Sequence, residues 1–211
     1  MNEIRIIDTE GVGSQTVALE LETPDEFDAE PGQFVLLQGV IDGEKESGYY
    51  TISSPTVDDS FQVTVEYDEQ AALGLWLSNR STGESIGVQG PLGDIRYTGG
   101  DAVPIAAGPG IGPAIGITER AVLEGAHATL IYVTEDPIYE ERMAQLKSSL
   151  AKVNTVRNIE NIDRCLPDRA GEYDVYLFGY NEFIESVEES VPLVESGSDD
   201  VHVERFGPRP D

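Results

Sequence analysis

The chain has 211 residues, of which 39% are apolar, enough to bury a core and to form either two small domains or one large one. Asp and Glu number 40 against 13 Lys and Arg, which gives a formal net charge of −27 at pH 7. A chain this acidic lacks the basic stripe that releases the counterions of a nucleic acid, so we expect no nucleic-acid partner.

The acidic residues are spread along the whole chain rather than gathered in a tail. Such a surface repels itself in dilute buffer, but about 1 M salt shortens the Debye length to roughly 3 Å and screens the repulsion. The charge bias therefore predicts a halophilic protein that works in a salt-accumulating cell. The alternative is an acidic docking face for a basic partner.

No apolar run reaches the length of a membrane span, and residues 1–5 lack the basic and apolar parts of a signal peptide, so we expect a cytoplasmic protein. Cys165 is the single cysteine, which excludes an internal disulfide and any cluster held by four cysteines of this chain. His127 and His202 match no metal-ligand spacing, and no metal site is predicted.

Residues 1–98 have the pattern of β-strands. Apolar and polar residues alternate over residues 17–22 and 61–67, which is typical of strands with one buried face. Turn residues, such as Pro31-Gly32 and Asp42-Gly43, separate the runs repeatedly. This spacing favours an antiparallel barrel or sandwich.

From about residue 101 the pattern changes, and strands alternate with helices. Apolar strands are expected over residues 102–107, 128–133, 173–178 and 201–206. Helices are expected from Pro113, from Asp136-Pro137 with Tyr139, Met143, Leu146 and Leu150 at helical spacing, and around Phe183, Val187 and Val191. The alternation predicts an α/β domain with a doubly wound parallel sheet, beginning after a boundary at residues 99–101.

A glycine-rich turn follows the first of these strands, at Gly108, Gly110 and Gly112. Backbone NH groups and a helix N-terminus at such a turn can hold a pyrophosphate, and glycines leave room for its approach. The pattern is not the standard Rossmann fingerprint, and a tight strand-to-helix turn without a ligand needs the same glycines.

Six segments occur in the order expected of the ferredoxin-NADP reductase superfamily, which the chain resembles over nearly its whole length. They are Pro31-Gly32-Gln33-Phe34-Val35, Tyr50-Thr51-Ile52-Ser53-Ser54-Pro55, Gly90-Pro91-Leu92-Gly93, residues 107–113, residues 173–179, and Glu204-Arg205-Phe206. The resemblance implies an FAD-binding β-barrel domain over residues 1–98 and an NAD(P)-binding α/β domain over residues 101–211.

Four catalytic residues follow from this resemblance. Tyr50 would pack its phenol on the isoalloxazine, and the Thr51 hydroxyl would bond near flavin N5. Glu204 and Phe206 would lie near the flavin face that receives hydride. A buried barrel tyrosine is the alternative for Tyr50.

The resemblance also implies further cofactor contacts. Those expected around the flavin are Ile52, Ser53, Tyr67, Gly74, Leu75 and Trp76. Those expected around the nucleotide are Gly108, Pro109, Gly110, Ile111, Gly112, Phe178 and Gly179. Glu135 would meet the adenosine ribose, where a carboxylate repels a 2′-phosphate and so favours NADH over NADPH. Asp136 is expected to cap its helix instead.

The chain also departs from the superfamily's motifs. Gly48 stands where an arginine grips the FAD pyrophosphate, so a bidentate charged contact of about 1.5 to 3 kcal/mol is lost. The hydroxyl of a second phosphate-holding segment is absent from residues 71–74, and Pro109 replaces a threonine. At the late Cys-Gly-Pro element the chain has Phe178 and Tyr180, and a ring at residue 178 would fill the nicotinamide pocket.

The resemblance thus predicts an FAD-dependent NAD(P)H oxidoreductase that passes electrons to a separate acceptor protein or small molecule. One alternative is a redox-inactive binding or regulatory subunit that kept the reductase fold. Another is a flavoprotein subunit of a larger enzyme that receives its electrons from a partner. The segment from Gly207 to Asp211 is expected to cover the flavin or to order a partner surface.

Overall fold

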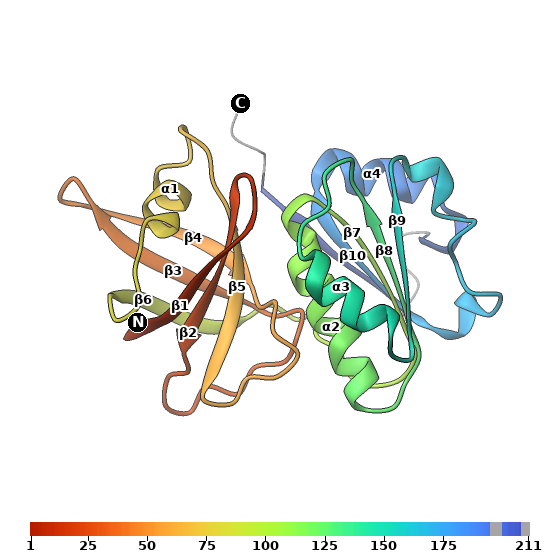
Figure 1. Cartoon of the computed structure of the whole chain (residues 1–211), viewed down its shortest axis with the longest axis horizontal. Coiled ribbons are helices and arrows are strands. Elements are labelled where there is room, and N and C mark those ends of the chain that lie inside the picture. Colours follow the sequence, from red (N-terminus) through yellow and green to blue (C-terminus); the bar gives the residue numbers. More distant parts are fainter. Residues whose placement is uncertain (195–199, 208–211) are drawn as a thin grey trace.

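A computed structural model describes residues 1–194 and 200–207, and it has two domains that lie side by side (Figure 1). A connection from Leu92 to Ala102 joins them, and the expected boundary at residues 99–101 falls within it. Residues 208–211 of the segment expected to cover the flavin lie outside the described residues. In the described part of the chain, no helix is long and apolar enough to cross a membrane.

The first domain is a six-stranded antiparallel sheet in the order β4-β3-β6-β1-β2-β5. Its elements are β1 (Asn2–Gly13), β2 (Thr16–Glu22), β3 (Phe34–Ile41), β4 (Glu44–Thr51), β5 (Ser60–Glu66), α1 (Ala72–Ser78) and β6 (Ser85–Leu92). An isolated bridge between Ile52 and Val63 links the end of β4 to β5, the opposite edge of the sheet, and so curls the sheet into a barrel. Leu19, Leu37 and Val63 are fully buried inside it. The predicted antiparallel barrel is confirmed.

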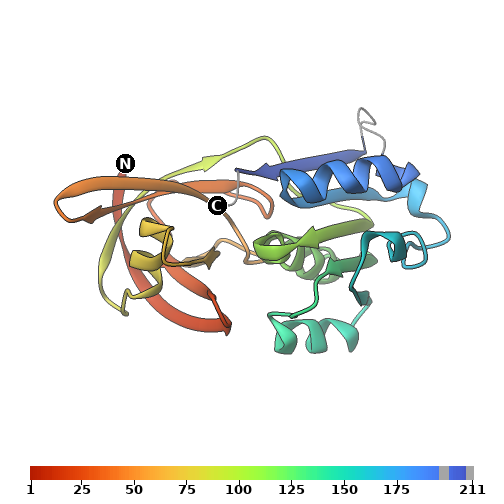
Figure 2. The same ribbon diagram turned by 90° about the horizontal axis from the view of Figure 1, so that it is seen from above.

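The second domain is a five-stranded parallel sheet in the order β11-β10-β7-β8-β9. Its strands are β7 (Ala102–Ala107), β8 (Ala128–Val133), β9 (Ala151–Val156), β10 (Asp174–Tyr180) and β11 (Val201–Phe206). Its helices are α2 (Ile111–Leu123), α3 (Glu140–Lys147) and α4 (Asn181–Ser190). α2 and α3 pack on one face and α4 on the other, so the predicted doubly wound sheet is confirmed (Figure 2).

The helix expected from Asp136-Pro137 begins later than predicted, at Glu140. The NH of Asp136 bonds to the Thr134 hydroxyl in a local turn, so Asp136 does not cap the helix. Tyr139, at the position before the helix, has a φ of 58°, which breaks the helical path and lets its ring reach the barrel. Leu150 lies beyond the end of α3 and is 53% exposed, so its helical spacing was misleading.

The sequence analysis predicted no strand at residues 151–156, where β9 pairs in parallel with β8 at the edge of the sheet. An edge strand is covered on fewer sides than a central one, and here only Ala151 is fully buried. Because the strand is largely exposed, its residues need not follow a clear alternating pattern.

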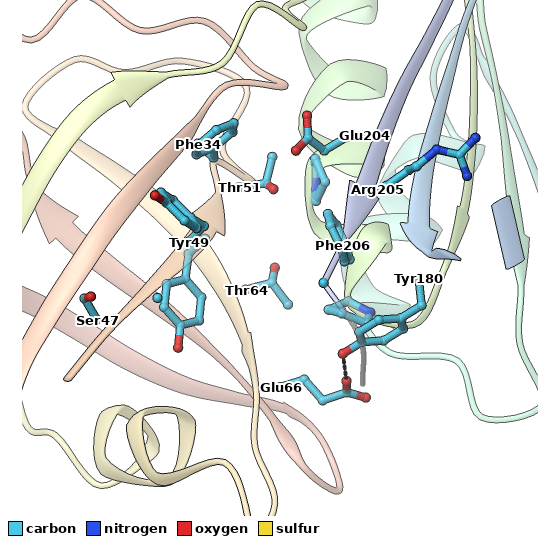
Figure 3. A pocket seen from close by; sticks show the side chains of 15 residues that line it. Phe34, Ser47, Tyr49, Thr51, Thr64, Glu66, Tyr180, Glu204, Arg205 and Phe206 are labelled. Carbon is cyan, nitrogen blue, oxygen red and sulfur yellow. Dashed lines mark hydrogen bonds between the residues drawn. The ribbon is translucent and has the colours of Figure 1, made fainter. Parts of the chain in front are cut away.

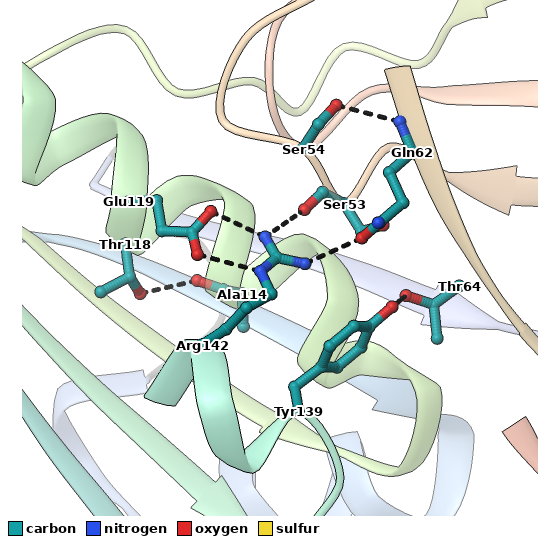
Figure 4. Close-up of polar contacts among 9 residues, drawn as sticks. All are labelled: Ser53, Ser54, Gln62, Thr64, Ala114, Thr118, Glu119, Tyr139 and Arg142. Atoms are coloured by element: carbon teal, nitrogen blue, oxygen red, sulfur yellow. Dashed lines mark hydrogen bonds and ion pairs between the residues drawn. The ribbon is translucent and has the colours of Figure 1, made fainter. Parts of the chain in front are cut away.

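The two domains meet directly, because α2 presents glycines to the barrel. A Cβ at Gly112 would overlap the Thr64 hydroxyl, and one at Gly116 would come within 3.0 Å of the Ser53 carbonyl oxygen. Next to this contact, the hydroxyls of Tyr139 and Thr64 share a buried hydrogen bond of 2.7 Å (Figure 4). The contact sets the relative position of the strand ends that line the site.

Candidate functional site

A cavity of about 590 Å³ lies where the two domains meet (Figure 3). Its volume falls within the range of roughly 300 to 1,000 Å³ that is typical of small-molecule and cofactor sites. The barrel contributes Phe34, Ser47, Gly48, Tyr49, Tyr50, Thr51, Thr64 and Glu66. The second domain contributes Pro109, Pro113, Tyr180, Glu204, Arg205, Phe206 and Gly207. All four residues expected to be catalytic line this cavity, although their roles stay predictions.

Tyr50 is partly buried against the barrel wall beside Gly48. A Cβ at Gly48 would lie 3.1 Å from Leu73 Cδ2 and 3.2 Å from Tyr50 Cε2. The space that a side chain at residue 48 would enter is therefore already crowded by Leu73 of α1 and by the Tyr50 ring. Burial raises the pKa of Tyr50 to about 12, so its phenol is neutral at physiological pH.

Glu204 and Phe206 reach the cavity from β11, and they face Thr51 across it (Figure 3). Their position follows from the parallel pairing of β10 and β11, in which Glu204 is opposite Phe178 and Phe206 is opposite Tyr180. Burial raises the pKa of the Glu204 carboxyl. A carboxyl group with a raised pKa in a cleft can hold a proton at a pH where exposed carboxyls are ionised.

Tyr180 lies at the end of β10. Of the two aromatic residues at the late Cys-Gly-Pro element, Phe178 and Tyr180, it is the one that lines the cavity. Its hydroxyl donates a 2.7 Å hydrogen bond to Glu66 Oε2 of the barrel, and its ring meets Phe206 edge-on with centroids 6.1 Å apart. Phe178 was expected to fill the nicotinamide pocket, but its side chain is fully buried in the core with α2. That expectation is corrected, because α2 and the turn at Gly110 cover residue 178, whereas Tyr180, on the same face of β10, lies two residues further along at the end of the strand.

The charges around the cavity do not form a phosphate clamp. The Arg205 guanidinium is held by both oxygens of Glu188, at 2.7 Å each. The Asp68 carboxylate accepts hydrogen bonds from the backbone NH groups of Gln70 and Ala71, which puts a negative charge just before α1. Arg96 lines a separate cavity of about 430 Å³ beside the C-terminal end of α2.

The cavity lining therefore suits the isoalloxazine ring of FAD better than the FAD phosphates. Aromatic and threonine side chains provide a surface for an isoalloxazine ring, and the cavity has room for it. Within residues 1–194 and 200–207, no lysine or histidine lines the cavity, and its single arginine is paired. The same part of the chain places no three His, Cys, Asp or Glu residues where they could hold a metal ion.

Several residues expected around the flavin lie elsewhere. Ile52 is fully buried in the barrel core, and Ser53 is buried in the contact with α2. Trp76 packs on Gly39 of β3, with the Arg80 guanidinium 4.3 Å from its ring centroid. The remaining three also miss the cavity: Tyr67 and Gly74, which pack together at the end of β5, and Leu75, which is 38% exposed on α1.

Most residues expected around the nucleotide are packed rather than open. Pro109 lines the cavity, and Gly108 lies beside the Tyr180 ring. The structure buries Gly110 under the Phe178 carbonyl, Ile111 in the core, Gly112 against the barrel and Gly179 under the Phe183 ring. These glycines therefore allow close packing, and their expected contact with a pyrophosphate stays a prediction. Glu135 is exposed just after β8, at the carboxyl end of the sheet.

The structure also adds lining residues that the sequence analysis did not expect to contact a cofactor. They are Phe34, Ser47, Tyr49, Thr64, Glu66, Pro113, Tyr180 and Arg205. Phe34 lies in one of the segments that carried the resemblance, and Thr64 and Glu66 share one face of β5. Only the barrel's closure shows that this face opens to the cavity.

Residues 3–97 match the family model of the oxidoreductase FAD-binding domain. The chain is 34% identical over 124 residues to the glycine betaine monooxygenase reductase subunit of Chromohalobacter salexigens, with 56% of this chain covered. It is 28% identical over 194 residues to the ferredoxin reductase component of 3-ketosteroid-9-alpha-monooxygenase of Mycolicibacterium smegmatis, with 83% of this chain covered. The chain spans 34% and 55% of the lengths of these two relatives.

The fold is also found among solved structures. The flavohem-like FAD/NAD binding domain of nitric oxide dioxygenase from Vibrio cholerae superposes with a TM-score of 0.79 at 18% identity, covering 98% of each chain. Residues 3–97 thus match the FAD-binding domain of oxidoreductases, and the whole chain has the two-domain fold of FAD- and NAD(P)-binding oxidoreductases. The same fold is found in the ferredoxin-NADP+ reductase of Plasmodium falciparum, which fits the superfamily resemblance of the sequence motifs.

Proposed function

We propose that the chain is the flavin reductase part of an electron-transfer system, which oxidises NADH and passes the electrons through FAD to a separate acceptor. The observation that carries the proposal is the cavity itself, which Tyr50 and Thr51 of the barrel line together with Glu204 and Phe206 of the second domain. Thr51 faces Glu204 and Phe206 across it (Figure 3). Relatives named as reductase components of monooxygenases support a separate oxygenase or ferredoxin as the acceptor.

When bound, FAD supplies the acceptor for hydride from a reduced nicotinamide and a store from which electrons leave. The chain's own residues orient the reactants and keep water out. Tyr50 offers a neutral, partly buried ring as one wall, and Phe206 offers a second wall. The Thr51 hydroxyl can donate or accept a hydrogen bond, and the Glu204 carboxyl can hold a proton next to it.

We propose NADH as the donor, because Glu135 stands exposed after β8 at the carboxyl end of the sheet. In doubly wound folds a carboxylate near this place bonds to the free ribose hydroxyls and repels a 2′-phosphate. Glu135→Arg should therefore raise the ratio of NADPH to NADH turnover. A salt-rich cytoplasm as the site of action is part of the same proposal, on the strength of the net charge of −27.

A redox-inactive or partner-fed subunit is the second candidate function. Gly48, the paired Arg205 and the Asp68 carboxylate favour it, because among the described residues they leave the cavity lining without an unpaired cation for the FAD phosphates. The first candidate is preferred, because the aromatic walls and the partly buried Glu204 carboxyl remain in place.

An absorbance spectrum in about 2 M salt, taken before and after NADH is added without oxygen, tests the proposal. Flavin bands that bleach with NADH would support the reductase, whereas bands that bleach only with dithionite would point to a partner-fed subunit. No bands after excess FAD would indicate the redox-inactive alternative. Thr51→Val should slow bleaching by about 3- to 10-fold through one lost hydrogen bond, whereas Thr155→Val on exposed β9 should not.

A further inference from the structure

Tyr180 and Glu66 bridge the two domains at the cavity that the proposed function uses. Tyr180 ends β10 of the second domain, Glu66 ends β5 of the barrel, and both line the cavity. The Tyr180 hydroxyl donates a hydrogen bond of 2.7 Å to a carboxylate oxygen, which is a stronger contact than one between neutral groups. The bond is visible across the lower part of the cavity in Figure 3.

The Tyr180 ring also covers the start of the glycine-rich turn. A Cβ at Gly108 would lie 3.7 Å from Tyr180 Cε2, so the ring is in van der Waals contact with the turn. The Tyr180 ring also meets the Phe206 ring edge-on, at an interplanar angle of 87°. Tyr180 thus fills the space between the turn at Gly108 and the aromatic wall at Phe206.

This arrangement blocks a ligand that must occupy both places at once. A dinucleotide held at the turn by its phosphates can bring its nicotinamide to the Phe206 wall only through the space that the Tyr180 ring now fills. The Glu66 carboxylate adds a negative charge at the same place, which opposes the approach of phosphates. The side chain can leave without a change of fold, since Tyr180 is only partly buried and precedes α4 in extended conformation.

We propose that Tyr180 is a gate for the nicotinamide nucleotide, held shut by its hydrogen bond to Glu66, so that this pair sets nucleotide affinity. The inference rests on the proposed function, because it concerns the nucleotide that function requires. Bound nucleotide and the closed Tyr180–Glu66 contact exclude each other. The affinity observed is therefore the intrinsic affinity reduced by the fraction of molecules in which the gate is open.

The test is calorimetric titration of NADH into the full chain in about 2 M salt, without added flavin. Tyr180→Phe keeps the ring and removes the bond, and it should lower the dissociation constant by about 3- to 10-fold, as expected for one hydrogen bond. Glu66→Ala should also lower the dissociation constant for NADH. The double variant should gain less binding free energy than the sum of the two single variants, because both changes open the same contact.

Tyr173→Phe, the same chemical change just before β10 and away from the cavity, is the control and should leave the dissociation constant unchanged. Unchanged or weaker NADH binding by Tyr180→Phe, with normal binding by the native chain, would overturn the gate and leave the proposed function intact. NADH binding by no form of the chain would overturn both. Thermal unfolding of each variant shows that a changed affinity does not reflect misfolding.

Discussion

Arg142 Nη2 of α3 donates a 2.7 Å hydrogen bond to the backbone carbonyl of Ser53, two residues after Thr51 in the barrel (Figure 4). The same guanidinium binds both carboxylate oxygens of Glu119 on α2 and donates to the Gln62 side chain on β5. One side chain thus ties two helices of the second domain to two segments of the barrel. Arg142 therefore holds the two walls of the cavity in position, although it does not itself line the cavity.

Arg142→Ala should therefore lower the free energy of unfolding by about 1 to 3 kcal/mol, since hydrogen bonds to a charged group are lost and partners are left unpaired. Denaturant unfolding in about 2 M salt measures the change. Arg169→Ala is the matched control, because its pair with Glu172 is exposed, with side-chain accessibilities of 73% and 58%. Such a pair contributes roughly 0 to 1 kcal/mol. Equal losses in the two variants would contradict the proposed importance of the Arg142 contacts.

Gly112→Ala should weaken the contact between the domains, because the new methyl group would overlap the Thr64 hydroxyl. Overpacking of this kind costs about 1 to 3 kcal/mol. The loss of stability should be accompanied by faster hydrogen exchange of the backbone amides around Thr64 and Tyr139, whose hydroxyls share the contact. Gly171→Ala, where nothing lies within 4 Å of the new Cβ, should leave both measurements near those of the native chain.

Gly48→Arg combined with Leu73→Ala should tighten FAD binding. The arginine restores a bidentate phosphate contact, and the alanine vacates the space that Leu73 Cδ2 now occupies, 3.1 Å from the Cβ. A gain of about 1.5 to 3 kcal/mol corresponds to a dissociation constant roughly 10- to 100-fold lower. Titration followed by flavin fluorescence measures it, with Leu73→Ala alone as the control. No gain over that control would mean that FAD phosphates do not lie beside residue 48.

Glu204→Gln should change stability in a pH-dependent way. Burial raises the pKa of Glu204 above its value in the unfolded chain, so the folded state favours the protonated carboxyl. The stabilisation that comes from this group is complete below the unfolded pKa of about 4.3 and is lost as the pH rises through the folded pKa. The variant should therefore gain stability relative to the native chain as the pH rises from about 4.3 through the folded pKa of Glu204.

Denaturant unfolding of both proteins across this pH range tests the sign. Glu185→Gln, at an exposed carboxylate on α4, controls for the loss of one negative charge. If the free energy of unfolding of the native chain instead rises relative to that of the Glu204 variant as the pH increases, the cavity stabilises the ionised carboxylate and the prediction is wrong.

The acidic surface should make folding depend on salt. At about 0.1 M salt the Debye length is roughly 10 Å, so like charges repel across the surface, whereas at about 1 M it is roughly 3 Å. We expect the thermal unfolding midpoint to rise steeply between these concentrations of KCl. A midpoint that stays flat would favour the alternative of an acidic docking face and would weaken the halophilic interpretation.

The sequence by itself determined the order and type of the domains. The alternation at residues 17–22 and 61–67, and the strand-and-helix alternation after residue 101, are local patterns that follow from side-chain geometry along one element. The motifs also identified the superfamily and placed Tyr50, Thr51, Glu204 and Phe206 in lining segments. Local patterns did not predict β9, an edge strand with a single buried residue. They also placed the start of the helix near Tyr139 too early, because Tyr139 contacts Thr64 of the barrel.

Only the tertiary structure decided which way each candidate residue faces. α2 covers Phe178 but not Tyr180, which lies two residues further along the same face of β10 and lines the cavity, and helix packing turns Gly112 toward the barrel. Trp76 lies on Gly39, a residue from a distant strand. These outcomes depend on pairing register and on close packing between segments far apart in the chain, which no local pattern encodes. The site therefore combines residues whose types the sequence predicted with neighbours that only folding brought to them.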